Sequence, residues 1–274
     1  MNGSNIRWIK VAIMANWRKR RGRSNSQRKL KILISILVLL AVSLMAVPFS
    51  KYFLIATHSQ LACTTIRYQV PKNIPPPEDV KPLNIQDVIG VTQKTSDDAI
   101  GQVVIPKVEI SQPIFLGLTT DHLIDGVVSL FPQREPDLGS LTLIGHRAGL
   151  YQLLFARIEE LKKGDSIYIQ YLNDYYQYEV EKTSVIKETE VDQLADKGAE
   201  FLFLVTCRQE EKTPYRIFVE AKKVHEEKAL IESFKQEAEI VKQAKDKQYL
   251  VEFILPLLLI ILVAILFLIF VWRT

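Results

Sequence analysis

Two long runs of apolar residues stand out along the chain, one near each end. Residues 32–49 and residues 253–272 contain no charged side chain. As helices, both runs are long enough to cross a hydrocarbon core of about 30 Å, and a proline near the start of such a helix is tolerated. A buried core helix would have to explain a second run that is apolar on every side. We therefore predict transmembrane helices over 32–49 and 251–272.

Basic residues gather before the first apolar run and face no acidic residue there. The ten are Arg7, Lys10, Arg18, Lys19, Arg20, Arg21, Arg23, Arg28, Lys29 and Lys31. Because basic residues mark the cytoplasmic side of a membrane, we predict that residues 1–31 are a cytoplasmic tail and that, with two spans, both termini are cytoplasmic. A cleaved signal peptide is the alternative, but Leu44, Met45 and Ala46 form a poor small-residue cleavage site.

Between the spans, short alternating or continuous apolar runs predict many β-strands. The clearest signal is a hairpin in which apolar or aromatic positions alternate with others on both sides of a turn at Asn173 and Asp174. Its alternating positions are Ile167, Ile169, Tyr171, Tyr176, Tyr178 and Val180. One helix is expected through Leu154 and Ile158, ending at Gly164. Many short strands with one or two helices predict a mainly β domain of the β-barrel kind.

Composition sets the borders of this domain, which we place at residues 99–225. The stretch 50–98 is rich in proline and scattered polar residues, a composition that disfavours regular structure and suits a linker or a lid. Residues 226–250 repeat apolar positions at spacings of three and four among Glu and Lys, as an amphipathic helix does. We predict a helical stalk there, with packing against the domain or against a membrane protein as the alternatives.

The net charge of +4 gives no support to a nucleic-acid partner. Removing the ten basic residues of the tail leaves the remainder at −6, whereas nucleic-acid surfaces need basic residues clustered on one folded face.

The two cysteines, Cys63 and Cys207, first suggest a disulfide in an extracytoplasmic domain. Because Cys63 lies in the irregular segment shortly after the first span, we expect it to stay unpaired and Cys207 to be a free thiol.

Three reactive side chains lie at the ends of different predicted strands. Cys207 ends the apolar run 201–206, His146 follows the apolar run 141–145, and Arg216 opens the next strand. A cysteine nucleophile needs a base and a positive charge that lowers its pKa. Taken alone, Cys207 is more typical of a buried core cysteine, and His146 of a histidine with structural partners. Together the three predict an active site.

These residues resemble the signature of the sortase family of cysteine transpeptidases. That signature has a strand ending in TLxTC, an upstream histidine after Gly or Ser, and an arginine eight or nine residues after the cysteine. Here the matching residues are 203–207, His146 after Gly145, and Arg216. The resemblance covers about residues 100–224. It implies a closed eight-stranded sortase-type β-barrel with one or two short helices, flanked by the two transmembrane helices.

The resemblance also implies a reaction. Cys207 would attack a backbone carbonyl in an LPxTG-like sorting signal, between its threonine and glycine, and form a thioester. His146, as an imidazolium, would protonate the departing amine and later deprotonate the incoming one. Arg216 would stabilise the oxyanion or hold the signal, and Thr206 is a candidate for binding the substrate. The acceptor amine would come from a lipid-linked peptidoglycan precursor or from a pilin lysine, with no cofactor.

Two features depart from the family pattern. Phe203 stands where the family usually has threonine. The C-terminal span resembles the pilin-polymerising class C, yet the proline-rich segment lacks the Asp-Pro-aromatic lid of many of its members, since Asp79 and Pro82 are not adjacent. The core resembles the housekeeping class A. The subfamily therefore stays open.

Other residues are weaker candidates for a functional role. No His or Cys spacing predicts a metal site; acidic residues could bind calcium, as in some sortases, but solvated carboxylates are the simpler account. Those acidic residues are Glu109, Glu188 and Glu190. No role is assigned to His58, His122 or His225. Arg147 and Arg208 are expected to point to the strand face opposite their candidate neighbours.

Two other classes of protein remain as alternatives. A papain-like cell-wall peptidase usually places its cysteine before its histidine, at the start of a helix, whereas His146 precedes Cys207 here. A membrane-anchored β-domain that only binds or scaffolds would need no reactive thiol.

Overall fold

The computed structural model describes residues 3–61, 66–91, 99–149, 153–224 and 230–273. The chain forms two compact units. One unit joins Met1–Pro48 with Ile254–Thr274, and the other is Phe49–Phe253. The second unit contains every strand of the described chain, and the candidate residues of the site belong to it.

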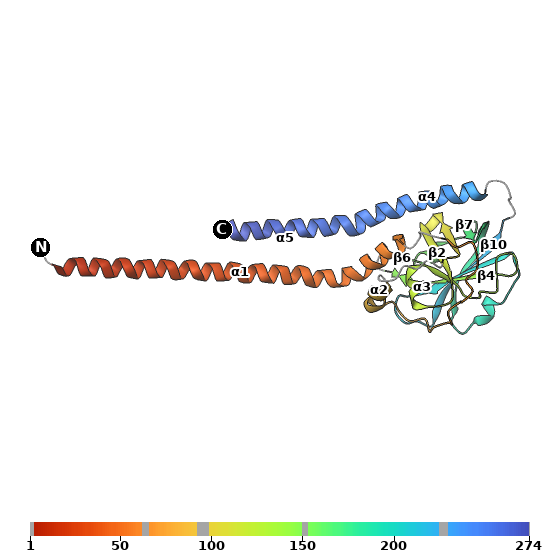
Figure 1. Ribbon diagram of the computed structural model, residues 1–274, viewed down its shortest axis with the longest axis horizontal. Helices are drawn as coiled ribbons and strands as arrows, with labels where there is room; N and C mark the ends of the chain where they lie inside the picture. The colour runs from red at the N-terminus through yellow and green to blue at the C-terminus, as the bar shows by residue number, and fades with distance from the viewer. Residues whose placement is uncertain (1–2, 62–65, 92–98, 150–152, 225–229, 274) are drawn as a thin grey trace. The chain divides into compact units, whose positions relative to one another are not determined.

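The second unit is built on a closed β-barrel (Figure 1). Its eight strands are β1 (Gly101–Ile105), β2 (Ile110–Leu116), β3 (Val127–Ser129), β4 (Leu141–Gly145), β7 (Ser166–Tyr171), β8 (Asp174–Lys187), β9 (Phe201–Cys207) and β10 (Tyr215–Lys223). They follow the order β1-β2-β3-β4-β9-β10-β8-β7 around the barrel. A separate two-stranded sheet pairs β5 (Arg147–Ala148) with β6 (Leu153–Leu154). The predicted closed eight-stranded barrel is confirmed.

The barrel mixes parallel and antiparallel pairs, which places the end of β4 beside the end of β9. Strands β2 and β3 run parallel, as do β4 and β9, and the other neighbours are antiparallel. Because side chains alternate along a strand, the inward positions fill a single core. Among its fully buried members are Val103, Ile114, Leu143, Phe155, Ile169, Tyr178, Leu204 and Val219.

The predicted hairpin forms as β7 and β8. Ile167, Ile169 and Tyr171 are the buried positions of β7, and the strands pair from Ser166 opposite Glu179 to Tyr171 opposite Asp174. The turn lies one residue earlier than predicted, because Asp174 already begins β8. Leu172 takes the positive φ of 52° that this tight turn requires.

The helix predicted through Leu154 and Ile158 is wrong. Leu154 ends β6 in a left-handed conformation with φ of 58°, and only a single 3-10 turn follows, at Ile158–Glu160. The apolar spacing that suggested a helix reflects burial: Leu154, Ile158 and Leu161 are all buried. Gly164 does end the segment, with φ of 93°, and donates its N–H to the carbonyl of Val180 at 2.9 Å.

Two short helices decorate the barrel, α2 (Ile85–Val91) and α3 (Thr120–Asp125). The hydroxyl of Thr119 caps α3 by accepting from the N–H of His122 at 3.2 Å. The ring of His122 stacks on Phe115, and its Nδ1 lies 2.8 Å from the carbonyl of Gly117. His122 is thus a structural residue of a helix that the sequence pattern had not indicated.

Helix α1 (Gly3–Leu61) is longer than the predicted span. Residues 50–61, placed by prediction at the start of the irregular linker, continue the helix, and Ile55 is fully buried in the second unit. The described linker beyond it, residues 66–84, is irregular as predicted. The linker residues 62–65, which include Cys63, and 92–98 lie outside the described residues.

Helix α4 (Leu230–Tyr249) packs against the barrel instead of forming a free stalk. Phe234 and Val241 are buried and belong to one apolar cluster with Val104 of β1. The ring of Phe234 meets that of Tyr175 edge-on, with centroids 5.2 Å apart. The apolar face of this amphipathic helix is therefore covered by β-strand residues, which was the alternative reading of its pattern.

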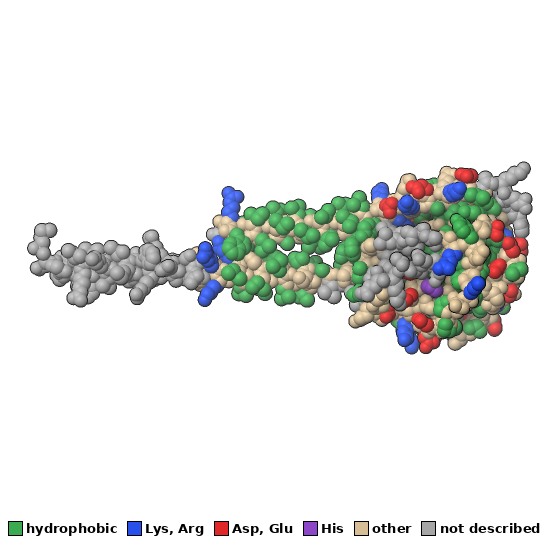
Figure 2. Space-filling model, viewed as in Figure 1, with side chains coloured by type: hydrophobic (Ala, Val, Ile, Leu, Met, Phe, Trp, Pro, Cys, Tyr) green, Lys and Arg blue, Asp and Glu red, His purple; other side chains and the backbone are tan. Residues whose placement is uncertain are grey.

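Two helical segments of the described chain are long and apolar enough to cross a membrane. One is Ser26–Ala46 within α1. The other is Leu230–Arg273, which begins with α4 in the second unit and ends with α5 (Leu255–Arg273) in the first. Figure 2 shows hydrophobic side chains covering the visible face of Ser26–Ala46 and of α5. These two candidate membrane helices flank the barrel in sequence.

Candidate active site

The three predicted groups meet where strands β4, β9 and β10 end or begin. Cys207 and Arg216 are direct partners in the antiparallel pairing of β9 with β10. Strand β4 runs parallel to β9, with Ile144 opposite Val205. Parallel neighbours leave a sheet at the same edge, so His146, just after β4, emerges on the side where Cys207 ends β9. Three segments distant in sequence thus converge at one end of the barrel.

Buried contacts fix this corner. The hydroxyl of Thr206 donates to the carbonyl of Gly145 at 2.8 Å, and both residues are buried. The carbonyl of His146 accepts from the N–H of Phe155 at 2.9 Å. A Cβ at Gly145 would lie 2.8 Å from the ring of Phe155, so only glycine fits here. Thr206, predicted to bind substrate, acts in this structure as a buried tie between β9 and β4.

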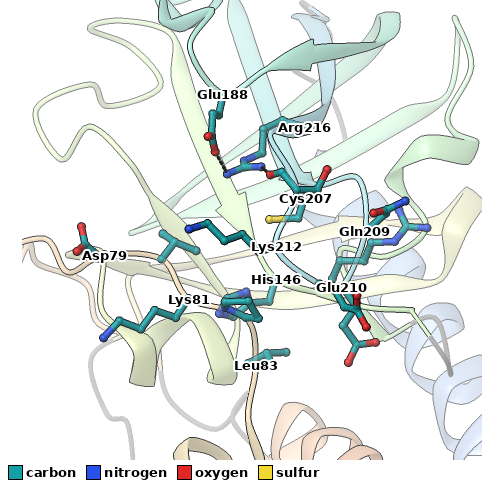
Figure 3. A pocket seen from close by; sticks show the side chains of 15 residues that line it. Asp79, Lys81, Leu83, His146, Glu188, Cys207, Gln209, Glu210, Lys212 and Arg216 are labelled. Carbon is teal, nitrogen blue, oxygen red and sulfur yellow. Dashed lines mark hydrogen bonds and ion pairs between the residues drawn. The ribbon is translucent and has the colours of Figure 1, made fainter.

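A cavity of about 490 Å³ lies at this edge and contains all three candidate groups (Figure 3). Its walls come from the strand ends, the β9–β10 loop and the linker segment 79–83. The linker is held near the barrel because Glu78 accepts from the N–H of Thr120 at 3.0 Å and from its hydroxyl at 2.9 Å. The proline-rich segment therefore forms one wall of the site.

Cys207 is a half-buried free thiol. Burial raises the pKa of this thiol above its ordinary value, and the positive charge of Arg216 opposes that effect. The carboxylate of Glu188 raises the pKa further, while Arg147 lowers it. At neutral pH the resting sulfur is therefore mainly the neutral thiol.

His146 is only 6% exposed. Burial, with a smaller contribution from the positive charge of Lys51, lowers the pKa of its imidazole to about 4. The ring is therefore neutral at pH 7 in this conformation, not the imidazolium that the family resemblance implies. Within the described chain no hydrogen bond joins it to Cys207, although both side chains face the same cavity. The resting pair is a thiol and an imidazole.

The guanidinium of Arg216 is already engaged. Its Nη2 contacts the carboxylate of Glu188 at 2.7 Å, and its Nη1 donates to the carbonyls of Thr213 and Tyr215. Figure 3 shows this ion pair at the rim of the cavity, beside Cys207. A planar guanidinium offers five N–H donors, so it can keep this ion pair and still donate a hydrogen bond to a group bound next to the sulfur.

Several residues of the site were missed or misplaced by sequence reasoning. Arg147, expected on the opposite strand face, lines the cavity; its Nη1 is buried without a hydrogen-bond partner among the described residues, and its Nη2 pairs with Glu159. The two-residue strand β5 is too short for alternation to place a side chain. Glu188, considered from the sequence only as a calcium ligand, and Glu210, not considered at all, also line the cavity. No local pattern marks them, because their partners lie far away in sequence.

Two of the three carboxylates considered for calcium contact arginine side chains in this structure. Glu109 contacts the guanidinium of Arg157 at 3.3 Å, and Glu188 contacts Arg216. In the described part of the chain, no group of three or more His, Cys, Asp or Glu side chains is placed to hold a metal ion.

Comparison with known proteins places this site in a family context. A family model described as a sortase domain matches residues 103–224. Sortase A of Listeria monocytogenes (serovar 1/2a, strain EGD-e) is 30% identical over 127 residues, which are 46% of this chain and 57% of the relative. A sortase-like protein of Bacillus subtilis (strain 168), YwpE, is 30% identical over 86 residues, 31% of this chain and 84% of the relative.

The solved structures that are similar include a sortase C-1 from Actinomyces oris. It is 28% identical, covers 63% of this chain and 98% of its own, and has a TM-score of 0.44. The chain spans about three fifths of the length of the sortase A relatives it matches in Listeria monocytogenes and Bacillus anthracis.

Proposed function

Because this chain belongs to the sortase family of cysteine transpeptidases, we propose that it is a membrane-anchored transpeptidase that cleaves an LPxTG-like sorting signal through a thioester on Cys207. The observation that supports this most directly is the cavity that holds Cys207, His146 and Arg216 together. A nucleophile, a base and a cation at one strand edge are the groups that acyl transfer needs.

The first half of the reaction starts from the neutral pair. His146 takes the proton of the Cys207 thiol, and the thiolate attacks the carbonyl between threonine and glycine of the signal. The guanidinium of Arg216 stabilises the oxyanion that forms. When the C–N bond breaks, the imidazolium of His146 gives its proton to the departing glycine amine. The threonine carbonyl is left as a thioester on the sulfur.

The second half returns the enzyme to its starting state. An acceptor amine attacks the thioester, His146 removes a proton from that amine, and the new amide bond forms as Cys207 leaves as thiolate. The thiolate then regains the proton from His146. We propose an amine of a lipid-linked peptidoglycan precursor, or a pilin lysine, as the acceptor.

The linker segment 79–83 would have to move before a peptide could enter. It lines the same cavity as His146, whose side chain is buried. Displacing it would expose the ring, bring its pKa back toward the ordinary value, and favour the proton transfer that activates the sulfur. We propose that this part of the predicted linker serves as a lid.

The proposed location follows from the two candidate membrane helices. The basic residues before the first span support a cytoplasmic N-terminus, and two spans then return the C-terminus to the same side. The barrel would face the outside of the cell membrane. Sorting-signal proteins and both proposed acceptors would meet it there.

The test uses the full-length protein in detergent with a synthetic LPxTG peptide and an amine acceptor. Mass spectrometry should detect the peptide joined to the amine, and an acyl adduct on the tryptic peptide that contains Cys207. The Cys207→Ala variant should lose both. Hydrolysis without any transfer product would favour a cell-wall peptidase, and no reaction with a panel of related peptides would favour a binding domain.

A further inference from the structure

The carboxylate of Glu210 joins three segments around the candidate site. Its Oε1 accepts from Nζ of Lys51 at 2.7 Å and from the hydroxyl of Tyr52 at 2.9 Å. Its Oε2 accepts from the N–H of Gly149 at 3.1 Å. Glu210 lies three residues after Cys207, and Gly149 three residues after His146. One side chain thus links the loop after the cysteine, the loop after the histidine, and α1.

Glu210 is held as a carboxylate in this position. Burial opposes its ionisation, but the hydrogen bonds from Lys51 and Tyr52 outweigh that effect and keep the pKa of the carboxyl below its ordinary value. Its ion pair with Lys51 is mostly shielded, with side chains 21% and 20% exposed. Figure 3 shows Glu210 at the edge of the cavity, near His146.

The two donors on α1 sit on a well-packed piece of helix. The ring of Phe53 stacks with Tyr249 at 5.9 Å between centroids and meets the fully buried Phe253 at 6.2 Å. The hydroxyl groups of Thr57 and Tyr249 lie 3.1 Å apart. Lys51 and Tyr52 are therefore anchored by the aromatic cluster formed between this part of α1, the end of α4 and the π-helical turn after it.

We propose that Glu210 is a positioning residue that sets the relative placement of Cys207 and His146, and that Lys51 and Tyr52 hold the carboxylate of Glu210 in place. This inference rests on the proposed transpeptidation. The ladder of β9 with β4 ends before Cys207 and His146, so the loops beyond need other ties. The functional unit would then reach back to Phe49, well before the matched residues 103–224.

Glu210→Gln is the central variant, because it keeps the size of the side chain and removes the charge. With the LPxTG peptide and amine, we expect kcat to fall about tenfold while KM stays within about twofold, since small misplacements of reacting groups lower turnover more than binding. Tyr52→Phe removes the other donor on α1 without changing the charge near His146, and it should lower kcat in the same direction. The double variant should be no slower than Glu210→Gln alone, because both changes break one interaction.

The control is Glu220→Gln. Glu220 forms an ion pair with Lys197 at 2.6 Å, its side chain is 20% exposed like that of Glu210, and it does not line the cavity. If kcat fell equally in this control, a general loss of ion-pair stability would explain the result, and the positioning role would be refuted. Thermal unfolding of each variant is measured alongside, and rates are compared well below every transition.

A second readout does not depend on the sorting signal. Hydrogen exchange of the Gly149 amide, followed by mass spectrometry, should be about tenfold faster in Glu210→Gln than in the wild type. If the wild type fails to transfer the peptide, the proposed function fails, while this exchange still judges the contact. Unchanged kcat together with unchanged exchange would overturn the positioning role. If Glu210→Gln does not fold, Tyr52→Phe replaces it, and wild-type kcat in that variant would overturn the positioning role equally.

Discussion

Lowering the pH should destabilise the barrel unit through His146. The imidazole is buried and its pKa is lowered to about 4, from an ordinary value of 6.5, first by burial and then by the charge of Lys51. Between these two values the unfolded chain binds a proton that the folded chain does not. Stability therefore falls as the pH drops through this window, and the contribution of the neutral ring is fully present only above about pH 6.5.

The size of the effect follows from the same two values. One pKa unit corresponds to about 1.4 kcal/mol, so the complete loss is about 3 kcal/mol and roughly 2.5 kcal/mol of it has occurred at pH 4.5. For a unit of about 200 residues, 1 kcal/mol moves the Tm by about 2 to 4 °C. The expected loss is thus about 5 to 10 °C relative to a chain without the histidine.

The comparison is between wild type and His146→Gln, both full-length in a nonionic detergent. Thermal unfolding is followed by near-ultraviolet circular dichroism at pH 7.5 and pH 4.5, because the buried tyrosines of the barrel, Tyr171 and Tyr178, contribute to that signal only while they are packed. Other titrating groups are common to both proteins, so only the change in their Tm difference matters. If that difference is the same at the two pH values, His146 is not buried as a neutral ring, and the reasoning is refuted.

Three further substitutions test the packing around the site. Thr206→Val removes the buried hydrogen bond to the carbonyl of Gly145 and should cost about 1 to 3 kcal/mol in urea unfolding; an unchanged midpoint would contradict the tie between β9 and β4. Gly145→Ala would place a Cβ 2.8 Å from Phe155 and should cost about 1 to 3 kcal/mol, with a wild-type Tm as the contrary result. Phe234→Ala removes a buried ring that meets Tyr175 and should lower the free energy of unfolding by about 3 kcal/mol or more. If calorimetry shows no such decrease, α4 does not pack on the barrel and is a free stalk.

Local patterns carried much of the fold. The charge-free runs predicted both candidate membrane helices, because crossing a bilayer is a requirement on contiguous sequence. Alternation predicted β7 and β8, because burial on one face of a strand repeats every second residue. The same reasoning failed at Leu154. Apolar residues three and four positions apart are buried there, but they lie on a short strand and around a 3-10 turn, not on an α-helix. Spacing records burial, and more than one backbone produces it.

The active site, like the fold, was predictable from the sequence only in part. The residue types and order of His146, Cys207 and Arg216 were readable because their chemistry is distinctive and each follows or opens a strand. The protonation states of these side chains could not be predicted from the sequence. The family resemblance implied an imidazolium, whereas the ring is 6% exposed with the linker segment 79–83 as a neighbouring wall of the cavity.

By itself, then, the sequence determined the two apolar spans, the strand-rich domain between them and the three reactive side chains, since each is a property of neighbouring residues or of a short motif. Only the tertiary structure decided which charges surround them. Glu188 beside Arg216, Arg147 in the cavity wall, and Glu210 bound to Lys51 are contacts between segments brought together by barrel closure and helix packing. Electrostatic effects depend on distance and burial in space, and no local pattern encodes either.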